Sequence, residues 1–435
     1  MNAEGTWWQW VIGVALAALF LGFAIRAGRR LRFLVDTPTS KAKGVFIGQV
    51  ELAGRATISE PVTSYLAEAA TVWYRFSVEE EWERWETETY TDSKGKTQTR
   101  TVRKTGWRTV AHGGEEPPFF VQDDTGAVLI RPSGATVEPV TLFSETVGRG
   151  DALYFGKGPA DEIADTNHRR RFSEDGIPVD AALFVAGRAR ERADVVAPEI
   201  AKDRDAEMFL ISCRSEAKVQ RGYRLQFWLL GLLAVLPLPA VSVIVATGRE
   251  ELGVWLPIGL GGGVALLWAL SWLWMSFNSL VQLRNRVEQA WSLVEVQLKR
   301  RADLIPRLVA TVTGLRDHER RVQTEVAALR AQAQATPAWQ PGPDVAGVAP
   351  TVQAVIERYP ELKSDAAFLG LQRELSDTET RVALARDYFN AIATHHNTRL
   401  EIIPDRWLAP LAGLKARPLL GAETFERAAV AVKLG

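Results

Sequence analysis

Few residues in this sequence have the type and spacing that could support chemistry. Asp123 and Asp124 are adjacent carboxylates that could hold a metal ion, but the stretch "DDTG" joins two alternating runs and suits a tight hairpin turn, which we favour. His395 and His396 are also adjacent. On a helix they would point about 100° apart, so they cannot ligate one metal ion from the same face. We therefore predict no metal site.

The sequence also lacks the common catalytic motifs. It contains no His-Glu-x-x-His, no phosphate-binding Gly-x-x-x-x-Gly-Lys-Ser/Thr and no Gly-x-Ser-x-Gly. The single cysteine, Cys213, excludes an internal disulfide and a zinc site built from several thiolates. Lys plus Arg and Asp plus Glu both number 52, so no net charge favours a nucleic-acid partner. We predict no catalytic residue, no cofactor and no enzymatic activity.

Three apolar stretches are long enough to cross a bilayer, which takes about 20 helical residues. They cover residues 7–25, about 227–246 and about 254–277. Pro237 and Pro239 predict a kink in the second stretch. The lipid bilayer is therefore the first expected partner.

The charges that flank these stretches predict their orientation. Glu4 precedes the first stretch, and four arginines follow it: Arg26, Arg29, Arg30 and Arg32. This order indicates an uncleaved anchor with its N-terminus outside, because basic residues stay on the cytoplasmic side. Both large polar regions, 27–225 and 278–435, are then expected in the cytoplasm.

Residues 37–213 alternate apolar and polar side chains in short runs, which is typical of half-buried strands. The runs are "VFIGQVELAG", "TVWYRFSVEEEWERW", "FFVQDDTGAVLIRP", "ALYFGK" and "AALFVAGRARER". "YTDSKGKTQTRT" resembles the tip of a long polar hairpin. This spacing of strands predicts a small barrel or sandwich.

The region after residue 278 predicts long helices. Neither Gly nor Pro occurs between Val264 and Ile305, so the third apolar stretch can continue out of the membrane as one helix. Apolar residues recur along it at the spacing of one helical face, and a second helix over 368–403 repeats the pattern. We call the following residues the helix seam: Leu280, Leu283, Val287, Trp291, Val294, Leu298, Ile305, Leu375, Val382 and Phe389.

Two further features of this region need an explanation. Pro306 interrupts the first long helix and predicts a kink there. The basic run 299–301 is expected to pair with Glu374, Asp377 and Glu379 on the second helix. The pattern predicts a helical bundle, and a coiled coil completed by other copies of the chain stays open as an alternative.

The residues of the first region resemble a known domain. "DTPTSKAKGVFIGQVELAGRA" and "FFVQDDTGAVLIRP" are similar to the GIDE domain, also called the beside-a-membrane domain, of MULAN-type membrane ubiquitin ligases. Catalysis in those ligases implies a RING finger with several Cys and His ligands. With one Cys, this chain departs from that pattern, so only the membrane-adjacent β domain carries over.

The last region resembles the LemA family. The similarity lies in "QLKRRADLIPRLV" and in "YPELK", "LQRELSDTE" and "ARDYFN", and it covers nearly all of residues 278–420. The family implies a bacterial, membrane-anchored helical bundle without an established biochemical role. "HHN" at 395–397 departs from its more usual apolar-aromatic pattern.

These observations predict a multidomain α+β membrane protein of the bacterial inner membrane. The expected parts are a transmembrane anchor (1–32), a β-rich domain (33–213), a transmembrane hairpin (214–277) and a LemA-like antiparallel bundle (278–435). The predicted function is a self-associating, homo-oligomeric scaffold at the cytoplasmic face. Two alternatives stay open: an adaptor that recruits another membrane protein, such as a protease or an envelope-stress component, and an unrecognised enzyme in the β domain.

Overall fold

The computed structural model describes residues 7–91, 97–192, 194, 197–204, 206, 208–246, 255–315 and 366–420. The chain divides into two compact units. Met1–Gly44 and Ala217–Gly435 form what we call the helical unit, and Val45–Glu216 forms the β unit. The sequence also predicts a break over the Pro-, Gly- and Ala-rich stretch 335–350, followed by a short helix that begins at Thr351 and ends before Pro360; both lie outside the described residues.

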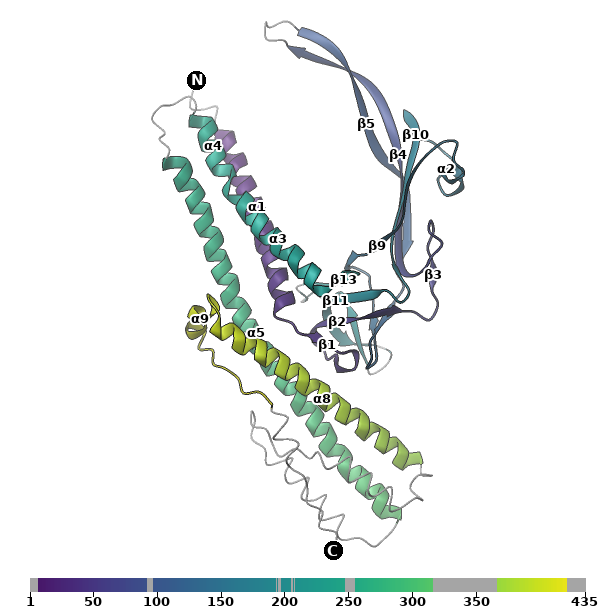
Figure 1. The fold of residues 1–435 in the computed structure, drawn as a ribbon, viewed down its shortest axis with the longest axis vertical. Helices are drawn as coiled ribbons and strands as arrows, with labels where there is room; N and C mark the ends of the chain where they lie inside the picture. Colours follow the sequence, from purple (N-terminus) through teal and green to yellow (C-terminus); the bar gives the residue numbers. More distant parts are fainter. Residues whose placement is uncertain are drawn as a thin grey trace. The chain divides into compact units, whose positions relative to one another are not determined.

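The helical unit is built around long helices (Figure 1). Its elements are α1 (Trp7–Val35), β1 (Thr39–Ser40), the 3₁₀ helix η2 (Ala42–Gly44), α3 (Glu216–Val235), α4 (Pro237–Ala246), α5 (Trp255–Leu315), α8 (Ala366–Glu401), α9 (Asp405–Leu408) and the 3₁₀ helix η4 (Ala409–Ala412).

Three helical segments are long and apolar enough to span a membrane: Trp7–Val35, Glu216–Val245 and Trp255–Arg301. They coincide with the three predicted stretches. The second is interrupted at Leu236, between the end of α3 and the start of α4 at Pro237. Proline has no backbone N–H to donate, so it is tolerated at the first position of a helix but not inside one. The break agrees with the predicted kink.

Small residues let these apolar helices approach one another. Ala27 of α1 packs with Phe227 of α3 and Met275 of α5 in one buried cluster. A Cβ atom on Gly231 would lie only 2.1 Å from the Trp268 ring. Close backbone approach at small residues is the usual way in which membrane helices pack.

Helix α5 continues past its apolar part, as predicted, and α8 lies along this second half (Figure 1). The absence of Gly and Pro from 264–305 allows this length, because neither a flexible nor a donor-less residue interrupts the hydrogen bonding. Helix α8 covers nearly the whole of the predicted second helix.

A small barrel forms one part of the β unit. Its strands are β2 (Gly48–Thr57), β6 (Phe119–Gln122), β7 (Ala127–Ile130), β12 (Pro198–Ala201) and β11 (Ala182–Glu191), in this order. Strand β2 also pairs with β11, which closes the ring around a core that includes Leu52, Val185 and Ile200. The sheet continues from β11 to β13 (Leu210–Ser212) and β8 (Thr136–Glu138).

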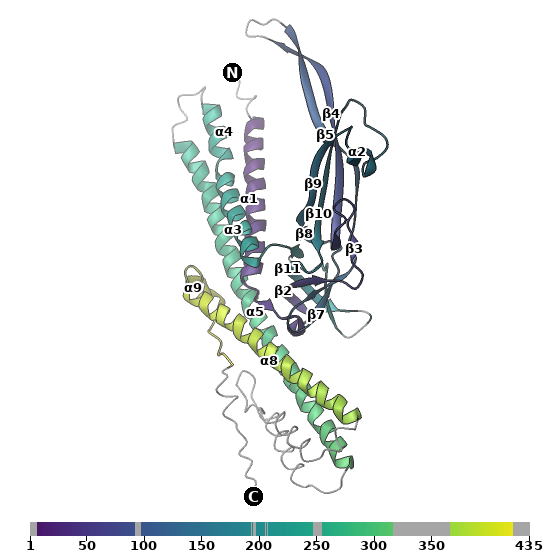
Figure 2. The same cartoon turned by 45° about the vertical axis from the view of Figure 1, so that its right-hand side comes forward.

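The second sheet contains a long hairpin (Figure 2). Its strands are β3 (Val62–Thr63), β4 (Ala70–Thr91), β5 (Thr97–Glu115), β9 (Val140–Gly148) and β10 (Thr166–Pro178). The order is β3-β4-β10-β9, and β5 pairs with β4. The ends of β4 and β5, residues 83–91 and 97–105, extend beyond the part of β4 that pairs with β10, and we call them the hairpin arm. Its predicted tip, 92–96, lies outside the described residues.

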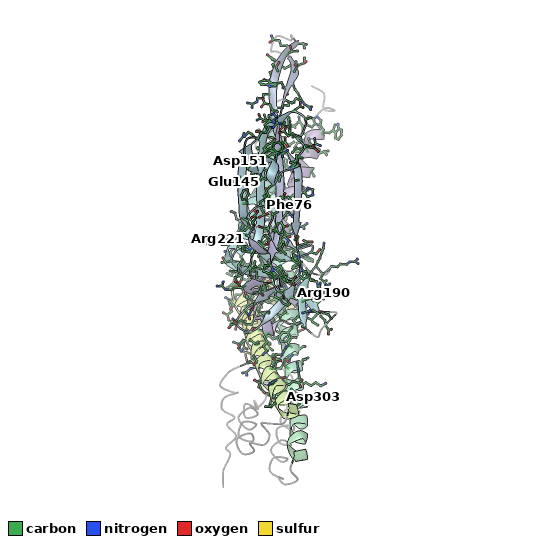
Figure 3. The ribbon with its side chains drawn as sticks, turned by 90° about the vertical axis from the view of Figure 1, so that its right-hand side faces the viewer. Phe76, Glu145, Asp151, Arg190, Arg221 and Asp303 are labelled. Carbon is green, nitrogen blue, oxygen red and sulfur yellow. The ribbon has the colours of Figure 1, made fainter. Side chains whose placement is uncertain are left out.

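Two predictions for the β unit have opposite outcomes. "DDTG" is a turn, since Asp123 Oδ1 accepts hydrogen bonds from the backbone N–H groups of Thr125 (2.7 Å) and Gly126 (3.1 Å) between β6 and β7. "ALYFGK" is wrong as a strand and forms the short helix α2 (Ala152–Gly156). The reason is the N-cap Asp151, labelled in Figure 3, whose carboxylate accepts from Leu153 N at 2.8 Å.

Candidate functional site

The helix seam lies between α5 and α8 of the same chain. Its members on α5 from Leu280 to Val294 are buried, and so are Leu375, Val382 and Phe389 on α8. The Trp291 and Phe389 rings meet edge to face with centroids 5.4 Å apart. Leu298 is only half-buried, and the side chains of Ile305 and Pro306 lie outside the described part, so the kink at Pro306 stays a prediction.

Polar residues replace the apolar ones toward the far end of the seam. Arg300 donates to Glu374 at 3.2 Å, and Arg301 pairs with Glu379 at 3.4 Å, as the sequence predicted. Asp377 has other partners: Lys43 of η2 at 2.6 Å and Arg381 at 2.9 Å. The segment after α1 is thus tied to α8 as well.

The most unusual arrangement in the helical unit surrounds the carboxylate of Asp36, the first residue after α1. One oxygen, Oδ1, accepts from Arg399 Nη1 and lies 3.1 Å from His395 Nε2. The other accepts from the Ser279 hydroxyl on α5. Arg399 also binds Asp405 of α9. We call Asp36, Ser279, His395, Arg399 and Asp405 the Asp36 cluster; all except His395 are buried.

Two further arginines support the cluster from α1 and α5. Arg32 of α1 donates to the buried Ser276 hydroxyl at 2.5 Å. Arg286 of α5 donates to the Thr37 hydroxyl, and its guanidinium lies 5.3 Å from the centroid of the Phe33 ring. The cluster therefore joins α1, α5, α8 and α9 at the point where α1 ends.

Burial and charge act in opposite directions on the groups of the cluster. Burial alone would raise the pKa of Asp36, but the hydrogen bond from His395 and the charge of Arg399 outweigh it and lower that pKa. Burial likewise opposes the charge of Arg399, yet Asp36 and Asp405 raise its pKa. Both groups are thus held in their charged forms, as a buried ion pair requires.

The neighbouring imidazole of His396 lies in a different environment. Its side chain is buried, and burial lowers its pKa, with a further contribution from the nearby Arg417. This histidine is therefore held neutral, whereas His395 faces Asp36. The two adjacent side chains, His395 and His396, therefore lie in different environments, as expected for consecutive residues of a helix.

The Asp36 cluster contains the residue types of a hydrolytic triad, namely Ser279, Asp36 and His395. Their spatial arrangement differs from that of a triad. In a triad the imidazole lies between the hydroxyl and the carboxylate and takes the proton from the hydroxyl. Here the carboxylate lies between the other two, and Arg399 stabilises its charged form. A carboxylate with a lowered pKa is a weak base, so the arrangement suits holding helices together better than activating Ser279.

A second buried ion pair lies in the β unit. Arg170 of β10 donates from Nε (3.0 Å) and Nη2 (2.9 Å) to Glu80 Oε2 on β4, and neither side chain is exposed. Its remaining N–H groups bind backbone carbonyls of Tyr154, Pro159 and Asp161 at 2.7–2.8 Å. Arg170 thus fixes the loop after α2 against the sheet.

Tyr154 completes this second site. Its hydroxyl donates to Glu162 at 2.9 Å, and burial followed by that bond raises the pKa of Tyr154 to about 12. Its ring centroid lies 4.1 Å from the Arg170 guanidinium carbon. Since these groups satisfy one another, they indicate a structural role.

The hairpin arm differs from both sites because it is exposed. Cross-strand ion pairs line it, among them Arg103 with Glu83 at 2.7 Å and Lys104 with Glu86 at 2.8 Å. Trp85 is 63% exposed on the same arm, and Tyr90 is also exposed. Exposed aromatic rings are typical of protein-binding surfaces, where Trp and Tyr are enriched.

The four arginines expected to set the topology lie in the last part of α1. Arg26 and Arg29 are exposed, Arg30 lies 5.8 Å from the centroid of the Tyr223 ring, and Arg32 binds Ser276 as described. Two of the four thus also stabilise helix packing. The orientation in the membrane stays a prediction.

Sequence reasoning missed the partners of Asp36, Glu80 and Arg170. Glu80 lies in a run of glutamates and Arg170 in a run of arginines, where each looks like a solvated side chain. The available signal is the position in the strand. Side chains alternate between the two faces of a strand, so Glu80 lies on the same face as the buried Val78, two residues earlier. Asp36, four residues after Arg32, could similarly have been a candidate partner for a buried cation.

The apolar helices and the two β-sheets together define a membrane-associated α+β protein. The LemA family pattern matches residues 290–434, and the GIDE pattern, described as an E3 ubiquitin ligase, matches residues 87–243. Both resemblances read from the sequence are confirmed. No curated protein shows significant similarity to the chain. Among the described residues, no group of three or more His, Cys, Asp or Glu side chains is placed to hold a metal ion.

Proposed function

We propose that this chain is a non-enzymatic scaffold of the bacterial inner membrane, with a helical bundle anchored rigidly to its membrane helices. The observation that carries the proposal is the Asp36 cluster. It ties the end of α1 to α5, α8 and α9 through a buried ion pair, which is the kind of link that keeps a bundle fixed relative to its anchor.

Self-association is the second element of the proposal. The seam between α5 and α8 is occupied within one chain, so contacts between copies would use other surfaces of the bundle. The predicted antiparallel bundle is favoured over a coiled coil made only between copies, because α8 already covers the apolar face of α5.

In-cell cross-linking of the full chain at its native level tests this proposal. A link that joins two peptides of identical or overlapping sequence can only connect two copies, so mass spectrometry separates such links from links within one copy. We expect such links from residues 280–312. Links only within single copies would overturn self-association.

An adaptor is the second candidate function, and the exposed aromatics of the hairpin arm favour it. In the same experiment, reproducible links from the arm to one other membrane protein would support it. The variant Trp85→Ala should remove those links, whereas Thr87→Ala, exposed on the same strand, should keep them. An enzyme in the β unit has less support, because Glu80, Arg170 and Tyr154 are buried and satisfy one another.

The proposed orientation has the N-terminus outside and both polar regions in the cytoplasm. Reporter fusions after Arg32 and after Gly435 test it in cells. Alkaline phosphatase should be inactive at both positions, and activity at either would overturn the orientation.

A further inference from the structure

An exposed apolar turn follows α8 in the helical unit. Within ten residues, Ile403 is 63% exposed, Trp407 is 67% exposed and Leu411 is 76% exposed, and Ile402 is exposed beside them. We call residues 402–411 the apolar turn. So much apolar surface in one short segment needs a cover other than water.

The backbone of the apolar turn is held in place. Arg406 N donates to Ile402 O at 2.8 Å, Trp407 N donates to Pro404 O at 3.0 Å, and Gly413 N donates to Pro410 O at 3.1 Å. The buried pair of Arg399 with Asp405 fixes the turn to α8. The apolar side chains are therefore presented outward by a fixed support.

The segment after the turn is also anchored. The Asn397 side chain donates to Arg417 O and accepts from Arg417 N, both at 2.8 Å. The Arg417 guanidinium binds Glu288 of α5 at 2.9 Å. Both ends of the turn are thus attached to the long helices.

The Asp36 cluster fixes the position of the apolar turn along the axes of α1 and α5. Asp36 follows α1 directly, and Ser279 lies just after the third apolar stretch. Arg399 and Asp405 join the turn to these two residues. Helices α9 and η4 also contact α5. The turn therefore lies where α1 and α5 leave the bilayer.

The lipid-facing surface of α5 reaches almost the same level. Trp274 is exposed on α5 and precedes Ser279 by five residues, a rise of about 7.5 Å. Tryptophan beside basic side chains is typical of the membrane–water interface, and Arg406 and Lys415 are exposed near Trp407.

From this placement we infer that the apolar turn inserts Ile403, Trp407 and Leu411 into the interfacial layer of the bilayer that the helices span. It gives the bundle a second membrane contact besides the transmembrane helices. The inference does not depend on which side of the membrane the bundle occupies, nor on the proposed scaffold function.

Nitroxide accessibility in the full chain tests the insertion. The variants Trp407→Cys and Val296→Cys are made on a Cys213→Ala background, spin-labelled and reconstituted into phosphatidylcholine–phosphatidylglycerol vesicles. Val296 is a matched control because it is apolar and exposed on α5, but it lies about 25 Å beyond Ser279. The label at 407 should show an accessibility ratio of oxygen to a water-soluble nickel complex several-fold above that at 296.

Two results would overturn the inference. Equal ratios at both positions would place the turn in water. Low accessibility to both reagents at 407, with spin–spin broadening that grows with protein density, would mean that a second copy covers the turn. A third label at Leu411→Cys should agree with the label at 407, which guards against a local effect of one substitution.

Discussion

Asp36, directly after α1, shares its carboxylate with Arg399, which lies 363 positions later near the end of α8. The pair is buried, and Ser279 and Asp405 make further hydrogen bonds with it. An ion pair of this kind costs free energy to bury but makes the fold sensitive to the loss of either partner.

The variant Asp36→Asn tests this sensitivity. We expect the free energy of unfolding of the helical unit to fall by about 3 kcal/mol, because Arg399 stays buried with one carboxylate partner fewer. Unfolding of the purified chain in detergent, followed by tryptophan fluorescence, measures the loss. Asp377→Asn breaks more exposed ion pairs on α8 and should cost clearly less; equal losses would contradict a special role for Asp36.

The variant Arg170→Lys tests the buried pair of the β unit. Lysine keeps the charge but cannot donate to Glu80 and to three carbonyl groups at once, so we expect a loss of about 3 kcal/mol. Arg103→Lys, at an exposed pair of the hairpin arm, is the matched control. Protease resistance of the β unit reports the effect, and an unchanged Arg170→Lys protein would show that the loop after α2 does not depend on the guanidinium.

Stability should fall in two steps as the pH is lowered. Burial lowers the pKa of His396, so its contribution is complete above the unfolded value of about 6.5 and is lost as the pH falls toward the folded value. The pKa of Asp36 is also lowered, so its contribution is lost only below about pH 3.9. His396→Leu should remove the first step from a series of melting temperatures and keep the second. A first step that persists in this variant would assign it to another group.

Gly231→Ala should disturb the packing of α3 against α5. The added Cβ would meet the Trp268 ring, and overpacking typically costs about 1–3 kcal/mol. Gly222→Ala on the same helix meets no atom within 4 Å and should be neutral or slightly stabilising. Resistance to unfolding by SDS compares the two, and equal behaviour would argue against close contact at Gly231.

Phe389→Ala tests the helix seam directly. Removing this buried ring, which meets Trp291, should cost about 3–5 kcal/mol. Val296→Ala, exposed on α5, should change the stability little. A small loss for Phe389→Ala would mean that α8 is held to α5 mainly by its polar contacts.

Periodicity and composition predicted much of the fold. The apolar stretches, the seam positions and the strands β2, β4, β5, β6, β7 and β11 follow from local patterns, because burial of one face imposes a repeat that can be counted along the chain. "ALYFGK" was misread as a strand, since six residues are too few to separate the two repeats and the N-cap Asp151 favours a helix. Strands β9 and β10 were not recognised; in β10 three consecutive arginines obscure the alternation.

The sequence by itself therefore determined that the chain has three membrane-length apolar helices, a β-rich region and a long-helix region. Only the tertiary structure decided which charges are buried. Asp36 meets Arg399 and Glu80 meets Arg170 through contacts between distant segments, whereas burial patterns are local. A single charged residue has no periodic signal, so its partner becomes evident only when the helices or strands that carry both residues are packed together.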